Sequence, residues 1–528
     1  MPDYMFLLES RLFPEQRAAL QRVQELAQAE GLNIYLTGGA VRDLISGLPI
    51  RDLDFTVQGN PAGLARKLEK EGARILLEEV NLRHIEMVFP PNVDVSLAAA
   101  RDEFYERPGT KPELRWATII EDLKRRDFSM NAVGISLNLA SRGLLLDPTN
   151  GLADLEKREI RVLTMHAFTN HPIRLLRIVR FAARTGFKLE SRTAEWFALA
   201  MERRLHKSLE GQAVGYEVRQ LAREENPVAV LKAWFARDLL GAIHPRLPKR
   251  QADYDGLNRL MRVRQAMEAN GSPPRLFAPV THYVLGRLKS RERCFALSRM
   301  EFRDAETQAV LGLEKEALKI VKVLKGRKTA APRDAYNFLE KAPLDLLAFI
   351  LVGVSNKKAL RKVSHYLYKW KPLRRALPAD ELAALGVPRG PKFDKILDDL
   401  FQLQLEGRAR NPQDRTKALR KLAGIKPEPK KKLRAKEEKR APKAPETKKK
   451  KGKAAAGEAA APAVQEPVEK GKPAPAAKPA PEGKPAPPKE SGKEKKPAPA
   501  APARKPPKRT PSYKPATKKG KGSKKKRR

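Results

Sequence analysis

The sequence predicts an α+β fold, in which a small head with a mixed sheet precedes an all-helical neck and body and a disordered basic tail. Up to about residue 150, short apolar runs alternate with helical patterns, which indicates strands and helices in one unit. From there to Ile425 the apolar residues keep a helical spacing, with almost no strand pattern. The remainder consists mainly of Lys, Pro, Ala, Gly and Glu. We therefore expect four parts, the head, neck, body and tail, at 1–150, 151–240, 241–425 and 426–528.

The head is expected to start with a helix and then to alternate strands and helices. Leu20, Val23 and Leu26 recur at helical spacing, and the run "NIYLT" that follows reads as a short buried strand. This strand ends at the pair Gly38-Gly39. The expected order is helix 14–29, strand 33–37, helix 40–47, strand 51–59, helix 60–73, strand 83–89 and strand 93–98.

The charge of the chain indicates a polyanionic partner. There are 107 Lys and Arg residues against 62 Asp and Glu, a formal net charge of +45, which is far more than solubility needs. A nucleic acid and an anionic membrane surface both fit this charge. No apolar run reaches the ~18 residues of a membrane span, and the acidic start of the chain argues against a signal peptide. The one cysteine, Cys294, excludes an intrachain disulfide, so we expect a cytoplasmic protein.

Roughly a third of the basic residues lie after Ile425, in a segment that has very few bulky apolar residues. Such a segment cannot bury enough surface to offset the entropy of ordering it. Two roles are open for it, a solubilising spacer and a non-specific tether for RNA. The terminal run "KKGKGSKKKRR" favours the tether, because dense positive charge binds a phosphate backbone without reading its sequence.

Three aspartates form the candidate catalytic centre. Asp52 and Asp54 are two residues apart on an expected strand and so share one face of it. Asp94 lies between two valines on a later expected strand. Neighbouring carboxylates repel unless a cation lies between them, and Mg²⁺ prefers one or two carboxylates together with phosphate oxygens. The pattern predicts a Mg²⁺ site held by Asp52 and Asp54 and completed by Asp94, with a solvated strand face as the alternative.

Gly38 and Gly39 lie one helix before the first two aspartates. A backbone without side chains can approach a phosphate group closely, and the helix that follows offers its positive end. The alternative is an ordinary tight turn.

Five stretches of the chain, taken in order, resemble motifs of a known family. They are "GGAVRDLISGLPIRDLDF", "EDLKRRDFSMNAVG", "DPTNGLADLEKREIRVL", "PIRLLRIVRFAARTGFKLE" and "LGVPRGPKFDKILDDLFQLQLEGRARN". They resemble the head signature, the ribose-recognition motif, the link to the neck, the neck helix that reads the base, and a C-terminal segment. The family is that of the class II tRNA nucleotidyltransferases and bacterial poly(A) polymerases, in the DNA polymerase β-like superfamily. The resemblance is close over residues 30–190 and loose beyond them.

The resemblance implies template-independent addition of nucleotides from ATP, with CTP as a second candidate, to the 3′ end of an RNA, with tRNA favoured. Asp52 and Asp54 would hold the metal ions, with Asp94 as the third acid. Asp127 and Asn131 are four residues apart and are expected on one face of a helix, near the ribose. The residues expected to contact the nucleotide are Gly38, Gly39, Arg42, Arg126, Asp127, Asn131, His171, Arg174 and Arg177.

The base-reading motif departs from the family pattern. The family carries Glu-Asp-x-x-Arg at this point, whereas this chain has "NHPIR", so Arg174 remains and the two carboxylates are replaced by Asn170 and His171. A neutral His171 could accept a hydrogen bond from an exocyclic amine, or donate one in its other tautomer. Strict selection of C and then A is therefore not expected. The segment 209–222 also lacks the acidic and basic pattern of the family's next motif.

The neck helix carries four arginines at steps of three and four residues, namely Arg174, Arg177, Arg180 and Arg184. This cationic stripe suits a nucleotide, and an ordinary amphipathic helix would look the same. Arg174 is the one expected to contact the nucleotide.

Two alternatives to the tRNA enzyme remain open. A poly(A) polymerase would act on general RNA, and a long cationic tail would help to hold it. An RNA-binding protein with an inactive head would explain the loss of the acidic pair before Pro172.

Overall fold

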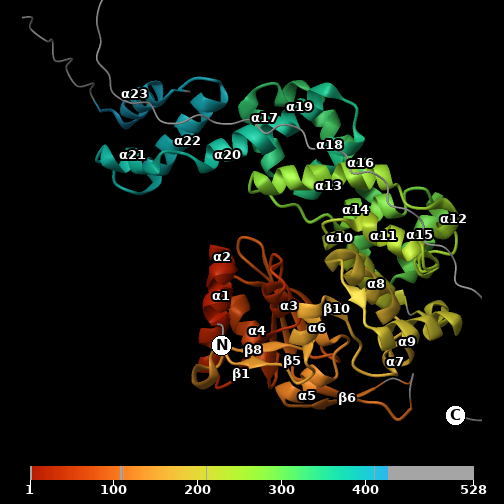
Figure 1. The fold of residues 1–528 in the computed structure, drawn as a ribbon. Coiled ribbons are helices and arrows are strands. Elements are labelled where there is room, and N and C mark those ends of the chain that lie inside the picture. Colours follow the sequence, from red (N-terminus) through yellow and green to blue (C-terminus); the bar gives the residue numbers. More distant parts are fainter. Residues whose placement is uncertain (1–2, 108–109, 111, 210, 410, 426–528) are drawn as a thin grey trace, which may run out of the picture. The chain divides into compact units, whose positions relative to one another are not determined.

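The computed structural model describes residues 3–107, 110, 112–209, 211–409 and 411–425 (Figure 1). The predicted tail, 426–528, lies outside these residues. Among these described residues, strands occur as far as Leu189 and only helices follow, which confirms the predicted mixed-sheet head and helical body. In the described part of the chain, no helix is long and apolar enough to cross a membrane.

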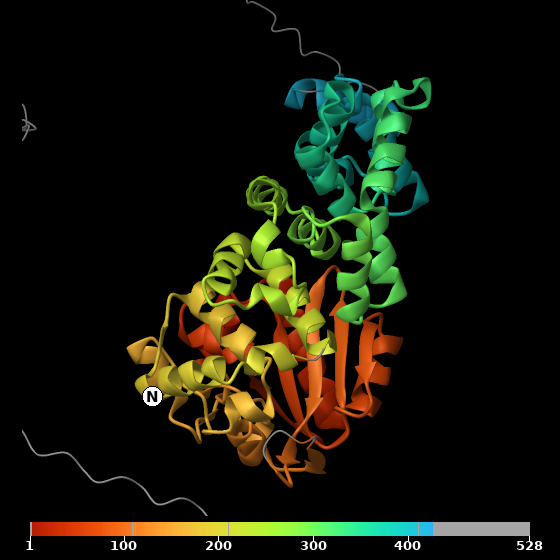
Figure 2. The ribbon, with the colours of Figure 1, turned by 90° about the vertical axis from the view of Figure 1, so that its right-hand side faces the viewer.

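The head contains a seven-stranded mixed sheet, which Figure 2 shows in red and orange. The strand order is β3-β4-β5-β2-β1-β8-β9. Strand β2 is antiparallel to β1 and parallel to β5, and the other neighbouring pairs are antiparallel. The strands are β1 (Asn33–Thr37), β2 (Leu53–Gln58), β3 (Arg74–Glu79), β4 (His84–Phe89), β5 (Val93–Ala99), β8 (Gly134–Ser136) and β9 (Leu145–Leu146).

The two strands that carry the aspartates bury one face and leave the other partly open. Leu53, Phe55 and Val57 of β2 are buried, and β5 buries every second residue from Val93 onwards. Since side chains alternate between the faces of a strand, the polar residues of β2 and β5 lie together on the opposite face.

The predicted helices of the head are present, and two of them begin with a recognisable start signal. Helix α2 begins with Pro14, and the side chain of Gln16 accepts the N–H of Phe13 at 3.0 Å. Helix α4 is capped by Asn60, whose side chain accepts the N–H of Ala62 at 3.0 Å. The helices up to residue 157 are α1 (Tyr4–Arg11), α2 (Pro14–Ala29), α3 (Gly39–Ile45), α4 (Pro61–Lys70), α5 (Ile119–Lys124) and α6 (Gly151–Lys157).

A second, two-stranded sheet in the head was not predicted. It pairs β6 (Arg101–Phe104) with β7 (Glu113–Trp116), and its strands mix charged and aromatic residues without a clear apolar face. Glu103 on β6 contributes to the base-reading end of the candidate site, as described below.

The residues after the head form a succession of helices, apart from one short strand pair, β10 (Glu159–Ile160) with β11 (Lys188–Leu189). Trp234 of α11 is fully buried and donates its ring N–H to the carbonyl of Leu176 in α8 at 2.9 Å, which ties these two helices together. The longer helices are α8 (Arg174–Thr185), α9 (Ser191–Glu202), α10 (Gly211–Arg223), α11 (Pro227–Phe235), α13 (Tyr254–Ala269), α14 (Phe277–Val284), α15 (Ser290–Arg299), α16 (Asp304–Lys325), α17 (Pro332–Glu340), α18 (Leu344–Gly353), α19 (Lys357–His365), α22 (Pro391–Leu405) and α23 (Pro412–Ala423). The shorter ones are α7 (Ala167–Asn170), α12 (Leu247–Arg250), α20 (Lys371–Arg375) and α21 (Ala379–Ala384).

The buried apolar residues form separate cores. One core lies in the head and runs from Met5 to Leu137, and a larger one joins Phe128 of the head to helices as far as Leu405. A small third core lies around Leu382 and Leu419. The domain boundaries at 150 and 240 remain predictions.

Candidate active site

The three aspartates lie at one edge of the sheet, because β2 and β5 are parallel neighbours. Leu53 pairs with Val95, and Asp54 pairs with Ser96. Extending this register by one residue places Asp52 opposite Asp94. The hydroxyl of Ser96 donates to Asp54 Oδ1 at 2.8 Å. Asp52 comes directly before β2 and Asp94 is the second residue of β5. The structure therefore brings the predicted carboxylates together on one face.

Two arginines from the helical part of the chain approach these carboxylates. Arg223 Nη2 donates to Asp52 Oδ1 and to Asp94 Oδ2, the latter at 2.8 Å, and Arg275 pairs with Asp94 Oδ1. Burial raises the pKa of Asp52 to about 6; the charges of Asp54 and Asp94 add to this effect, and Arg223 opposes it. The ionised form of Asp52 is therefore unfavourable unless a positive charge lies close to it.

The position of the Arg223 guanidinium shows what this cluster can hold. Oxygen atoms of Asp52 and Asp94 converge on one nitrogen atom, so the two carboxylates are oriented to share a cation. Among the described residues, no group of three or more His, Cys, Asp or Glu side chains is arranged to hold a metal ion. A divalent ion between the aspartates would therefore require Arg223 to move aside.

The glycine bend lies directly beside Asp54. Gly38 links β1 to α3 at φ +67°, and a Cβ atom there would be 3.1 Å from Arg126 Nη1. A Cβ atom on Gly39 would lie 3.2 Å from Asp54 Oδ2. Side chains at these positions would occupy the space between the carboxylate and the arginine, so the bend leaves the backbone open there.

We predict that Gly38→Ala lowers the free energy of unfolding by about 1–3 kcal/mol, since its backbone conformation is strained for any residue with a side chain. Urea denaturation measures the change. The matched control is Gly63→Ala in α4, which meets nothing within 4 Å and should be neutral or slightly stabilising. Equal effects of the two substitutions would contradict this account of the bend.

A chain of hydrogen bonds leads from the glycine bend to the ribose motif. Buried Arg42 donates to Asn131 Oδ1 at 2.8 Å, and Asn131 Nδ2 donates to Asp127 Oδ1 at 3.0 Å. Arg126 donates to the hydroxyls of Thr37 and Thr56 at 3.1 and 2.9 Å. These contacts hold the predicted nucleotide residues of the head in one network.

The prediction that Asp127 and Asn131 lie on one helix is wrong. Helix α5 ends at Lys124, and Asn131 belongs to a separate 3₁₀ turn, Ser129–Asn131. Asp127 Oδ1 accepts the N–H of Phe128 at 2.9 Å, and such a local bond competes with a helix. The two side chains nevertheless meet, through the turn.

The arginines of the neck helix α8 are mostly engaged in ion pairs. Arg177 bridges Asp127 Oδ2 at 3.0 Å and Glu217 Oε1 at 2.8 Å. Arg180 is buried and pairs with Glu217 and Glu224, and Arg184 pairs with Asp43 at 2.6 Å. The predicted stripe is therefore largely an internal network that joins α8 to α10 and to the head.

Arg174 differs from the other three arginines of the stripe. Within the described ranges its side chain has no hydrogen-bonding partner, although Asp127 and Glu103 lie near enough to act on its charge. Burial raises the pKa of Asp127, but the charges of Arg177 and Arg174 outweigh burial and lower it to about 2. Arg174 thus keeps a free guanidinium beside an ionised carboxylate at the end of the network.

The sequence did not point to Glu217, Glu224 or Arg223, all on or just after α10. The segment 209–222 departs from the expected pattern, and the partners of these residues lie 37 or more positions away in the chain. One available signal was the row of arginines on α8, because an arginine that becomes buried requires an acidic partner.

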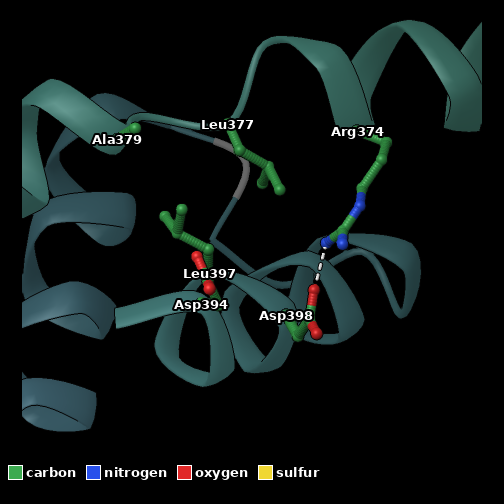
Figure 3. A pocket seen from close by; sticks show the side chains of 6 residues that line it. All are labelled: Arg374, Leu377, Ala379, Asp394, Leu397 and Asp398. Atoms are coloured by element: carbon green, nitrogen blue, oxygen red, sulfur yellow. Dashed lines mark ion pairs between the residues drawn. The ribbon is translucent and has the colours of Figure 1, made fainter. Parts of the chain in front are cut away.

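Two other features, His244 and a pocket near α20, do not resemble a catalytic centre. His244 is buried and its Nδ1 accepts the N–H of Arg246 at 3.1 Å, which indicates a structural role. A pocket of about 300 Å³ near α20, α21 and α22 contains one ion pair, Arg374–Asp398, and no cluster of acids (Figure 3). It is lined by Arg374, Leu377, Ala379, Asp394, Leu397 and Asp398.

The chain is similar to known nucleotidyltransferases in its head and over most of its length. A family model described as the poly A polymerase head domain matches residues 34–161. The A-adding tRNA nucleotidyltransferase of Halalkalibacterium halodurans is 29% identical over 77% of this chain and 93% of that protein. The A-adding enzyme of Geobacter sulfurreducens is 25% identical over 79% of this chain and 48% of its own length. The CC-adding tRNA nucleotidyltransferase of Deinococcus radiodurans is 28% identical over 79% of this chain and 96% of that protein.

The head fold, the aspartates beside a glycine bend and the matching head-domain model define a nucleotidyltransferase. The chain is similar to A-adding and CC-adding tRNA nucleotidyltransferases over 77–79% of its length, and its head matches the poly A polymerase head domain.

Proposed function

We propose that this protein adds nucleotides without a template to the 3′ end of tRNA, completing all or part of the terminal CCA. The observation that carries the proposal is the convergence of Asp52, Asp54 and Asp94 beside the bend at Gly38 and Gly39. A hydrogen-bonded network extends from there to the neck helix, which gives an elongated site with acids at one end and Arg174 at the other.

Mg²⁺ is the proposed cofactor, because the cluster offers carboxylate oxygens, the donors that this ion prefers. Asp52 and Asp54 would hold it, with Asp94 as the third acid. Bound there, the ion would activate the 3′ hydroxyl and neutralise the charge of the leaving pyrophosphate. The shared contact with Arg223 supports this fit, since it shows Asp52 and Asp94 aligned on one positive group.

The chain's own groups would bind and orient the substrates. The open backbone at Gly38 and Gly39 and the guanidinium of Arg126 suit the triphosphate. Asp127 and Asn131 have oxygen and nitrogen atoms suited to the ribose, and Arg42 fixes Asn131. The base would lie near His171, Arg174 and Arg177, at the start of α8.

ATP is the favoured nucleotide and CTP the second candidate. Two of the relatives described above are named A-adding enzymes and one is named a CC-adding enzyme. The poly A polymerase head-domain match keeps a poly(A) polymerase acting on general RNA as the runner-up. The cytoplasm is the proposed location.

The proposal is tested with tRNA transcripts that lack the last one, two or three nucleotides, each given one NTP at a time. Addition of a single AMP to tRNA ending in CC supports an A-adding enzyme, and addition of C residues to shorter ends supports CC or CCA addition. A long ladder with ATP alone on any RNA indicates the polymerase. No difference between the natural chain and an Asp52→Ala, Asp54→Ala variant would mean an inactive head that only binds RNA.

The tail leads to a separate prediction, although its residues lie outside the described ranges. Deleting everything after Ile425 should leave turnover of bound RNA unchanged and weaken RNA binding, most strongly at low salt, because screening removes charge attraction at high salt. Filter binding at several salt concentrations measures this. Unchanged affinity at low salt would contradict the tether role.

A further inference from the structure

His171, which replaces a carboxylate of the family's base-reading motif, is bonded to a carboxylate from another part of the head. Its Nε2 lies 3.3 Å from Glu103 Oε2 of β6 and also contacts the hydroxyl of Tyr105. The rings of His171 and Tyr105 meet edge to face, with centroids 5.7 Å apart. His171 is thus held by two side chains of the head, Glu103 on β6 and Tyr105 directly after this strand.

The protons of this group can be assigned from its geometry. The Tyr105 hydroxyl donates its single proton to Glu103 Oε2 at 2.8 Å, so the oxygen of Tyr105 can only accept from His171. Glu103 also accepts only, because it is ionised: burial raises its pKa, but the bonds from His171 and Tyr105 and the charge of Arg125 lower it to about 2. Both neighbours of Nε2 are acceptors, so Nε2 carries the hydrogen.

In a neutral imidazole ring with a hydrogen on Nε2, the other nitrogen, Nδ1, is an acceptor. Nδ1 of His171 has no hydrogen-bonding partner within the ranges that the structure covers, and the side chain is 32% exposed. The N–H of Arg174 is bonded to the carbonyl of His171 at 3.0 Å, so the free guanidinium lies one turn further along. The start of α8 therefore presents a hydrogen-bond acceptor, Nδ1 of His171, and one turn further along a donor, the guanidinium of Arg174.

We propose that Glu103, with Tyr105, is a positioning residue that fixes His171 as a hydrogen-bond acceptor at Nδ1, so that the site selects bases carrying an exocyclic amine. Adenine and cytosine present an amine donor next to a ring-nitrogen acceptor, which matches Nδ1 and Arg174. Guanine and uracil present a carbonyl oxygen in place of the amine and would face Nδ1 without a hydrogen bond. This inference rests on the proposed function and accounts for selection without the family's acidic pair on the neck helix.

The test compares the dissociation constants of ATP and GTP, with Mg²⁺ present, for the full chain and its variants. In Glu103→Ala the Tyr105 hydroxyl is free to donate to Nε2, which places the hydrogen on Nδ1. We expect the preference for ATP over GTP to fall about tenfold. The matched control is Glu113→Ala, which removes an exposed carboxylate from β7 of the same small sheet and should change the preference less than about twofold.

A rescue variant separates positioning from damage to the fold. In Glu103→Ala, His171→Asp the carboxylate accepts from the amine directly, and the preference for ATP should return to within about threefold of the natural value. A preference unchanged in Glu103→Ala, or a rescue variant as unselective as Glu103→Ala alone, would overturn the inference.

The tautomer itself is measured by ¹⁵N NMR of histidine-labelled protein, with the His171 signals assigned by their loss in His171→Asn. We expect a hydrogen on Nε2 in the natural chain and its loss from Nε2 in Glu103→Ala. A hydrogen on Nδ1 in the natural chain would overturn the inference. Neither binding nor NMR requires turnover, so a chain that fails to extend RNA would refute the proposed function and leave this result standing.

Discussion

Asp54→Asn should lower the rate of AMP addition at least about 10³-fold, which corresponds to ~4 kcal/mol of activation free energy. Asp54 is the acid beside the glycine bend: Oδ1 accepts from Ser96, and Oδ2 lies 3.2 Å from where a Cβ atom of Gly39 would be. Asparagine has nearly the same size but binds a divalent ion much more weakly. Single-turnover assays with saturating ATP measure the change.

The same substitution should not destabilise the head, because the charge of Asp54 is unfavourable to neighbouring Asp52, whose pKa it raises. The midpoint of urea denaturation should stay the same or rise. Asp102→Asn, an exposed aspartate of β6, serves as the control and should leave the rate unchanged. A loss of rate below about tenfold in Asp54→Asn would remove Asp54 from the catalytic centre.

Glu217→Ala is expected to produce the largest loss of stability, about 3–5 kcal/mol in the free energy of unfolding. Glu217 is fully buried and accepts from Arg177 at 2.8 Å and from Arg180 at 2.9 Å. Its removal leaves buried guanidinium groups short of a counter-charge between α8 and α10. Urea denaturation measures the loss, and Glu225→Ala, an exposed glutamate just after α10, should change stability by less than about 0.5 kcal/mol.

The pH dependence of this effect has a defined sign. Burial raises the pKa of Glu217, but the charges of Arg180 and Arg177 outweigh it, so the pKa is lowered. The contribution to stability is therefore complete above the ordinary glutamate pKa of about 4.3 and is lost as the pH falls below it. The difference between Glu217→Ala and the natural chain should shrink in acid. A difference that grows in acid would contradict this network.

The features that depend on a local pattern were predictable from the sequence. The alternation of Leu53, Asp54 and Phe55 identifies the buried and open faces of β2, and the glycine pair identifies the bend. The parallel pairing of β2 with β5, which brings Asp94 to the same edge, follows from no local signal. The pairing itself was not predicted; Asp94 was proposed as the third acid because it lies between two valines and because of the family resemblance.

The features that depend on distant partners were not predictable. Strand β6 has no apolar face, so nothing indicated that Glu103 would meet His171, which is 68 positions away. The basic stripe of α8 was interpreted as a nucleotide contact or as the polar face of an ordinary amphipathic helix, whereas Arg180 is buried against Glu217 and Glu224. Charge patterns show which residues need partners, and only the fold shows whether those partners are substrate or protein.

The central claim is that the aspartates at the shared edge of β2 and β5 bind a divalent cation. Titration with Mn²⁺, followed by its electron paramagnetic resonance signal in the presence of ATP, tests it most directly. The full chain should bind Mn²⁺ beyond what ATP alone binds, and the Asp52→Asn, Asp54→Asn variant should lose this excess. Equal Mn²⁺ binding by the two proteins would contradict the claim.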